Sequence, residues 1–125
     1  MSAKDKSVMI LANPGPLRDG LHALLFAMPQ IETVKLVDDL QTAMGHSNGR
    51  YPSLIVLDAD LAKGNVTSIV RQIKVRWPQS QSIFLANDVK QQLEAEDAGT
   101  DAALLKGSPP ARITATIVRL LSQRQ

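Results

Sequence analysis

The sequence contains no cysteine among its 125 residues. A chain without thiols has no disulfide scaffold, no thiol nucleophile and no cysteine-based zinc site. Aromatic residues are also few, with one Trp, one Tyr and two Phe, so the core has to be built from Leu, Ile, Val and Ala. The absence of cysteine fits a reducing compartment, and we expect a cytoplasmic protein.

Long apolar runs and a strong excess of one charge are missing as well. No segment is long enough to cross a membrane, and the polar residues 1–6 are not followed by the apolar stretch of a signal peptide. The net charge is +2, with acids and bases interleaved, which is too small an excess to predict nucleic-acid binding. We therefore expect this domain to contact neither a membrane nor nucleic acid directly.

A short apolar run near the middle of the chain ends at a carboxylate. Leu54 to Leu57 are all apolar, and Asp58 follows them. Its length, with Pro52 before it and a loop-like segment after it, predicts a strand that is buried on both faces. Ligands of open α/β sheets bind outside the carboxyl ends of the strands. Asp58 is therefore the first candidate functional residue.

Strand-like and helix-like segments alternate along the whole chain. The predicted strands span 8–12, 31–37, 53–58, 82–86 and 101–105, and the predicted helices span 16–28, 40–44, 66–77, 89–98 and 110–121. Segment 45–50 is predicted to be a loop. Asn65 is the expected N-cap of the third helix, and Asn87 or Asp88 that of the fourth, in which Val89, Leu93 and Ala98 are the apolar positions. Five strands alternating with five helices predict an α/β protein with a parallel sheet covered on both faces.

Residues 1–125 are expected to form one domain, with a core from about 8 to 121. Three segments near the strand ends resemble the receiver domain of response regulators, of the kind fused to helix-turn-helix output domains: 10–21, 52–58 and 104–110. The resemblance implies a flavodoxin-like (βα)5 fold, a three-layer sandwich whose five-stranded parallel sheet has the order 2-1-3-4-5. It implies a non-enzymatic protein of two-component (phosphorelay) signal transduction and transcription regulation. The implied partner is a histidine kinase or an output protein, and the first or last helix is the implied homodimer surface.

Two positions of the family's functional site are matched. Asp58 stands where the family has its phosphoacceptor, and Lys106 stands where it has a lysine that pairs with the phosphoryl group. A carboxylate is the nucleophile that forms an acyl phosphate, and a fixed cation offsets the charge that gathers on the transferring oxygens. The resemblance therefore implies these two roles for Asp58 and Lys106.

Four other family positions carry residues that cannot supply the usual chemistry. Ala12 and Asn13 stand where the family has two acidic ligands of Mg²⁺. Ala86 replaces the hydroxyl residue that moves to the phosphoryl group, and Ala103 replaces the aromatic residue that follows this motion. The resemblance is thus to a degenerate receiver, in which both parts of the usual switch are missing.

A metal site would have to use the oxygen-bearing side chains near the carboxyl ends of the first and third predicted strands. Mg²⁺ prefers carboxylate oxygens, so a site made of Asn13, Asp58 and Asp60 is expected to bind it weakly, and no other cofactor is predicted. We expect Asp58 to be neutralised by Lys106, with no neighbouring acid competing for the lysine. His22 and His46 have no ligand partners at metal-binding spacing.

Three functions stay open at this point. The first is an atypical receiver that acts through protein–protein interaction, with Mg²⁺-dependent phosphorylation impaired or absent. The second is an orthodox receiver that is phosphorylated on Asp58. The third, a remote alternative, is a flavodoxin-like enzyme that binds a small ligand. It is disfavoured because the loop at 13–16, Asn-Pro-Gly-Pro, has two prolines, which lack the N–H donors of a phosphate cradle.

Overall fold

Five parallel strands form a single sheet in the computed structural model, which describes residues 5–45 and 51–123. The strands are β1 (Lys6–Leu11), β2 (Ile31–Val37), β3 (Leu54–Asp58), β4 (Gln81–Ala86) and β5 (Ala102–Leu105). Their order in the sheet is β2-β1-β3-β4-β5, which confirms the predicted fold class and strand order. Of the predicted loop 45–50, only Gly45 belongs to the described residues, and His46 lies outside them.

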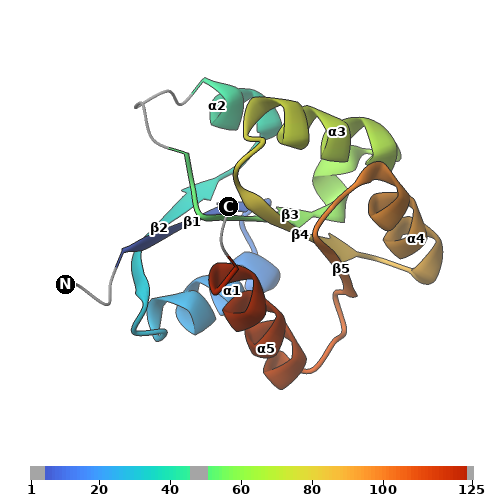
Figure 1. Ribbon diagram of the computed structural model, residues 1–125. Helices are drawn as coiled ribbons and strands as arrows, with labels where there is room; N and C mark the ends of the chain where they lie inside the picture. The colour runs from blue at the N-terminus through green and yellow to red at the C-terminus, as the bar shows by residue number, and fades with distance from the viewer. Residues whose placement is uncertain (1–4, 46–50, 124–125) are drawn as a thin grey trace.

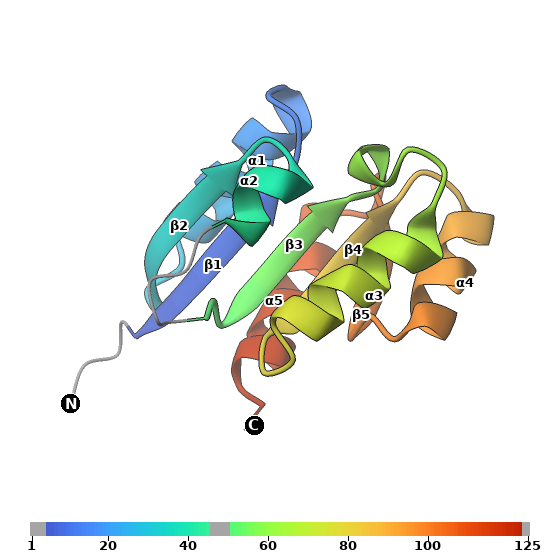
Figure 2. The ribbon, with the colours of Figure 1, turned by 90° about the horizontal axis from the view of Figure 1, so that it is seen from above.

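Helices cover both faces of this sheet (Figure 1). They are α1 (Pro16–Phe26), α2 (Leu40–Met44), α3 (Val66–Arg76), α4 (Val89–Ala98) and α5 (Pro110–Leu121), and a short 3-10 turn, η1 (Ala59–Ala62), follows β3. Helices α1 and α5 lie on one face, and α2, α3 and α4 lie on the other (Figures 1 and 2). The arrangement is the predicted three-layer sandwich. Within the described part of the chain, no helix is long and apolar enough to span a membrane.

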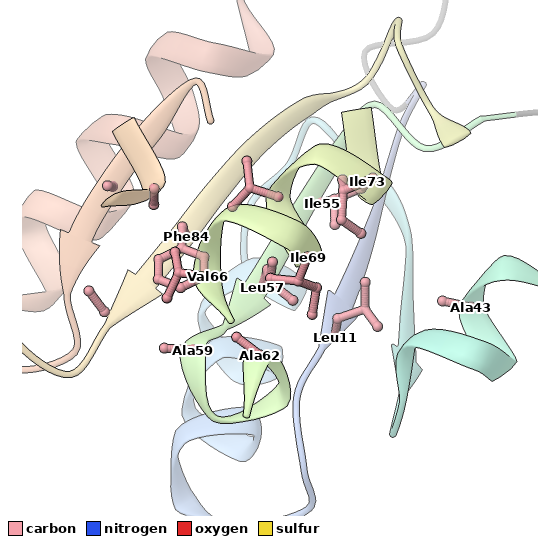
Figure 3. Close-up of a cluster of buried hydrophobic side chains, with 14 of the residues drawn as sticks. Leu11, Ala43, Ile55, Leu57, Ala59, Ala62, Val66, Ile69, Ile73 and Phe84 are labelled. Atoms are coloured by element: carbon pink, nitrogen blue, oxygen red, sulfur yellow. The ribbon is translucent and has the colours of Figure 1, made fainter. Parts of the chain in front are cut away.

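The central strand β3 is buried along its whole length. Successive side chains of a strand point to opposite faces, so Leu54 and Val56 pack in the core beneath α1 and α5, while Ile55 and Leu57 pack in the core beneath α2, α3 and α4. Figure 3 shows part of this second core, in which side chains of α3 lie over β3 and β4. The uninterrupted apolar run of β3 is explained by helices on both sides of it.

The fifth strand starts one residue later than the sequence predicts, at Ala102. The preceding residue, Asp101, uses its Oδ2 to accept hydrogen bonds from the backbone N–H of Ser82 at 2.8 Å and from its hydroxyl at 3.3 Å. Its side chain thereby anchors the start of β5 to the start of β4.

Side-chain caps set the starts of the helices that follow β3 and β4. The Oδ1 of Asn65 accepts a hydrogen bond from the N–H of Ser68 at 3.2 Å, and Asp88 caps α4 by accepting from the N–H of Gln91 at 2.9 Å. Gly99 ends α4 with φ of 108°, a left-handed conformation in which a side chain would be strained.

The cap of α3 gives a first prediction. We expect Asn65→Ala to lower the free energy of unfolding by about 1 kcal/mol, because one N–H of the first turn loses its partner. Asn65→Asp keeps a side-chain acceptor at the same position and is expected to leave stability nearly unchanged. Urea unfolding followed by circular dichroism measures both variants, and equal loss in the two would mean that the cap is not the cause.

The apolar face predicted for α4 is wrong. Val89 and Leu93 are both more than half exposed, whereas Ala95 is fully buried and Ala98 packs against the same core. The apolar side chains of this helix that pack on the core are those of two alanines, and Gln92 donates from its Nε2 to the carbonyl oxygen of Ala103 in β5 at 2.9 Å. The spacing of the larger apolar residues therefore identified a helix but not the face that it buries.

Candidate functional site

The carboxyl ends of β3, β4 and β5 meet at one edge of the sheet. Asp58 is the last residue of β3 and pairs with Leu85 of β4. Lys106 follows β5, and its backbone N–H donates to the carbonyl oxygen of Ala86 at 2.9 Å. This hydrogen bond continues the pairing of β4 with β5 by one residue and fixes the backbone from which the lysine side chain starts.

The structure brings Asp58 and Lys106 into direct contact. The lysine Nζ lies 2.6 Å from Oδ1 of Asp58, whose side chain is only 8% exposed, while that of Lys106 is 22% exposed. A nearly buried carboxylate needs a cation or several hydrogen-bond donors to stay charged. The expected pairing of these two residues is therefore present in the fold, and the roles that the resemblance gives them stay predictions.

A second carboxylate, that of Asp60, joins the pair. Its Oδ1 lies 3.1 Å from the same Nζ of Lys106, and its side chain is 55% exposed. The expectation that no neighbouring acid competes for the lysine is therefore wrong. The physical reason is η1, which curls the chain back over the end of β3. Its first turn is held by a hydrogen bond of 3.0 Å from the N–H of Asp60 to Oδ1 of Asp58.

Asn87, which follows β4, completes the cluster. Its Nδ2 donates to Oδ1 of Asp60 at 3.0 Å, and its own backbone N–H donates to Oε1 of Gln91 in α4 at 2.8 Å. From the sequence, Asn87 is expected only as a possible helix cap. Because Asp88 is the actual cap, the amide of Asn87 is available to the site. Its position directly after β4, like that of Lys106 directly after β5, is the signal that could have identified it.

The electrostatics of the cluster favour its charged form. The hydrogen bond from Asn87, and then the contact with Lys106, lower the pKa of Asp60 and outweigh the opposing effect of burial. Burial of the ammonium lowers the pKa of Lys106, but the bonds with Asp58 and Asp60 together outweigh it, so that this pKa is raised above its usual 10.5. Asp60 and Lys106 are therefore an ionised pair at neutral pH.

Within the described residues, the side chains at the four degenerate positions make no polar contact with this cluster. Ala12 is buried in the core beneath α1 and α5, and Ala86 and Ala103 are buried in the core on the other face. Asn13 follows β1 and is exposed. Three of these positions are thus parts of the hydrophobic packing.

The donor set fits a magnesium ion poorly. Both carboxylates of the site, Asp58 and Asp60, already contact the ammonium of Lys106, which a divalent cation would have to displace. In the described ranges 5–45 and 51–123, no group of three His, Cys, Asp or Glu residues is arranged to hold a metal ion. Weak binding of Mg²⁺ by Asn13, Asp58 and Asp60 stays a prediction.

Comparison with known proteins identifies the fold. No family model and no curated protein matches the sequence. The signal receiver domain of the response regulator NarL from Mycobacterium tuberculosis matches with a TM-score of 0.79 and 15% identity, over 97% of this chain and 99% of that one. The beryllofluoride-activated NtrC4 receiver domain dimer matches with a TM-score of 0.78 and 21% identity, over 94% and 97% of the two chains.

A longer protein matches over only part of its length. Full-length FixJ from B. japonicum gives a TM-score of 0.78 and 21% identity, over 95% of this chain but 60% of that one. At such identities the likeness concerns the fold. The chain has the fold of response-regulator receiver domains, in agreement with the resemblance read from its sequence.

Proposed function

We propose that this protein is an atypical receiver domain of two-component signal transduction, which acts by binding a protein partner. The observation that carries the proposal is the cluster of Asp58, Lys106 and Asp60 at the carboxyl ends of the strands of a receiver fold. The acceptor carboxylate and the lysine that would assist it are in contact. The groups that would bind a metal and respond to a phosphoryl group are replaced by alanines and one asparagine.

Impaired phosphorylation of Asp58 follows from the charges of the site. In the transfer, an oxygen of Asp58 forms a bond to the phosphorus of the donor while the bond from phosphorus to the leaving group breaks, which releases acetate when acetyl phosphate is the donor. Cations have to offset the negative charge on the transferring oxygens. Lys106 supplies one positive charge, but two carboxylates share it. Ala12 brings no ligand for a second cation, and Ala86 brings no hydroxyl. Both the approach of an anionic donor and the response to its phosphoryl group are weakened.

Binding of a protein partner is supported by apolar side chains on the helical surface. Phe26 of α1 is 79% exposed and Val118 of α5 is 40% exposed. The resemblance to receiver domains implies the first or last helix as the interaction surface, and each of them offers one of these exposed apolar side chains. We infer that α1 or α5 contacts a second copy, a histidine kinase or an output protein. The dimeric NtrC4 receiver domain supports a second copy as the partner, and the FixJ chain, which extends beyond the matched part, supports an output protein.

The test is an intact-mass spectrum after incubation with acetyl phosphate and Mg²⁺, with and without a chelator. We expect little or no phosphoryl adduct, while a receiver domain that has both acidic ligands is labelled in parallel. The matched variant is Asn13→Asp, which adds a carboxylate at an exposed position and is expected to increase labelling. A strong, chelator-sensitive adduct on the unmodified protein that disappears in Asp58→Asn would instead establish the orthodox phosphoacceptor.

A further inference from the structure

We propose that Asp60 is a positioning residue, a permanent anion that holds Lys106 and the start of α4 in one arrangement without any phosphoryl group. The proposal rests on the proposed function, because it describes the regulation of the same site. It concerns Asp60 itself, which lies two residues beyond the acceptor position.

Two hydrogen-bond donors converge on one carboxylate oxygen of Asp60. Oδ1 of Asp60 contacts the Nζ of Lys106 at 3.1 Å and the Nδ2 of Asn87 at 3.0 Å. The first donor follows β5 and the second follows β4, while Asp60 itself follows β3. A single carboxylate thereby connects the ends of three neighbouring strands. Both contacts are hydrogen bonds to an ionised acceptor, and the exposure of Asp60 limits what each contributes.

The connection continues into α4 through hydrogen bonds. The backbone N–H of Asn87, the residue held by Asp60, donates to Oε1 of Gln91 at 2.8 Å. The backbone N–H of Gln91 in turn donates to Oδ1 of Asp88, the N-cap, at 2.9 Å. The first turn of α4 is therefore linked to η1 through Asn87. Loss of the anion at Asp60 should loosen this turn first.

The cluster also sets the charge that an incoming anion meets. Asp58 and Asp60 together outweigh the single positive charge of Lys106, which repels an anionic phosphodonor. Asp60 is the exposed member of the cluster, whereas Asp58 is nearly buried. The charge of Asp60 can therefore be removed by substitution without disturbing the hydrophobic core.

The experiment uses Asp60→Ala and Asp60→Asn, which remove the charge of Asp60. The first control, Asp60→Glu, keeps the charge. The second control, Asp97→Asn, makes the same Asp-to-Asn change at an exposed position of α4. Amide hydrogen exchange read by NMR is measured at Asn87 and Gln91. We expect exchange at both to be about fivefold faster in Asp60→Ala, since the loss of a hydrogen bond of this kind changes a local equilibrium by about that factor. Asp60→Glu should restore part of the protection, and Asp97→Asn should leave it unchanged.

Two further readouts separate positioning from a general loss of stability. The lysine side-chain signals titrate at lower pH in Asp60→Asn, because one of the groups that raise the pKa of Lys106 is gone. Exchange at Leu57, in the middle of the sheet, stays as in the unmodified protein. Unchanged exchange at Asn87 and an unchanged titration of Lys106 would overturn the proposal. Ready phosphorylation of Asp58 would instead overturn the proposed function. The exchange at Asn87 and the titration of Lys106 are measured on the unphosphorylated protein, so that result would not change them.

Discussion

Replacing Phe84 by alanine is expected to lower the free energy of unfolding by about 3–5 kcal/mol. Phe84 lies in β4, between β3 and β5, and is fully buried. Its ring lies beside Val66 of α3 and near Ala59 of η1 (Figure 3). With so few aromatic residues in the chain, the smaller neighbours cannot fill the space that the ring leaves. Guanidinium unfolding, followed by circular dichroism, measures the loss.

The other phenylalanine of the sequence provides the matched control. Phe26 is 79% exposed at the end of α1, so Phe26→Ala should change the free energy of unfolding of the monomer by no more than about 0.5 kcal/mol, measured at a concentration at which the chain is monomeric. The two variants remove the same atoms, from a buried ring in β4 and from an exposed ring in α1. Similar losses in both would contradict the packing shown in Figure 3.

Most of the fold could be predicted from the sequence because each strand carries its own signal. The buried run that ends at Asp58 and the strand that ends before Lys106 place both residues at the carboxyl edge of one sheet, since parallel strands share that edge. The pairing of the two residues follows from their placement and opposite charges. The strand order itself came from the resemblance to a family, as periodicity says nothing about which strands are neighbours.

The rest of the site could not be predicted because it depends on local chain geometry. Asp60 reaches Lys106 only because η1 turns the chain back, and Asn87 reaches Asp60 only because Asp88 takes the cap position. Such turns are decided by a few hydrogen bonds rather than by a repeating pattern. The buried face of α4 was missed for a related reason, since Ala95 is small and Leu93 is large, and hydrophobicity alone favours the larger side chain.

Removal of the cation in Lys106→Met is expected to lower the free energy of unfolding by about 2–3 kcal/mol at neutral pH. Breaking a buried ion pair by removing one partner costs about 3–5 kcal/mol, and the partial exposure of Lys106 reduces this figure. The nearly buried carboxylate of Asp58 then loses its only ion-pair partner among the described residues. Lys90→Met, at an exposed position of α4, is the control and should change stability by no more than about 0.5 kcal/mol.

The double variant Asp58→Asn/Lys106→Met identifies the source of this loss. If the uncompensated charge of Asp58 is the cause, neutralising it restores part of the stability, and the double variant is more stable than the sum of the single losses by about 1–2 kcal/mol. Strict additivity, measured by urea unfolding of all four proteins, would mean that the two side chains do not interact across the 2.6 Å that separates them in the structure.

The pH dependence of the Lys106→Met loss follows from the two pKa shifts. The pKa of Asp60 is lowered from its usual 3.8 by Asn87 and Lys106, so its contribution is present above that pH and is lost as the pH falls through the lower folded value. The pKa of Lys106 is raised above 10.5, so its contribution is present below that pH and is lost as the pH rises through the higher folded value. The difference in the free energy of unfolding between the unmodified protein and Lys106→Met should therefore be largest between pH 3.8 and pH 10.5. It should become smaller as the pH falls through the folded pKa of Asp60 or rises through the folded pKa of Lys106. A difference that is independent of pH in thermal unfolding scans would show that lost packing of the lysine stem, and not its charge, causes the destabilisation.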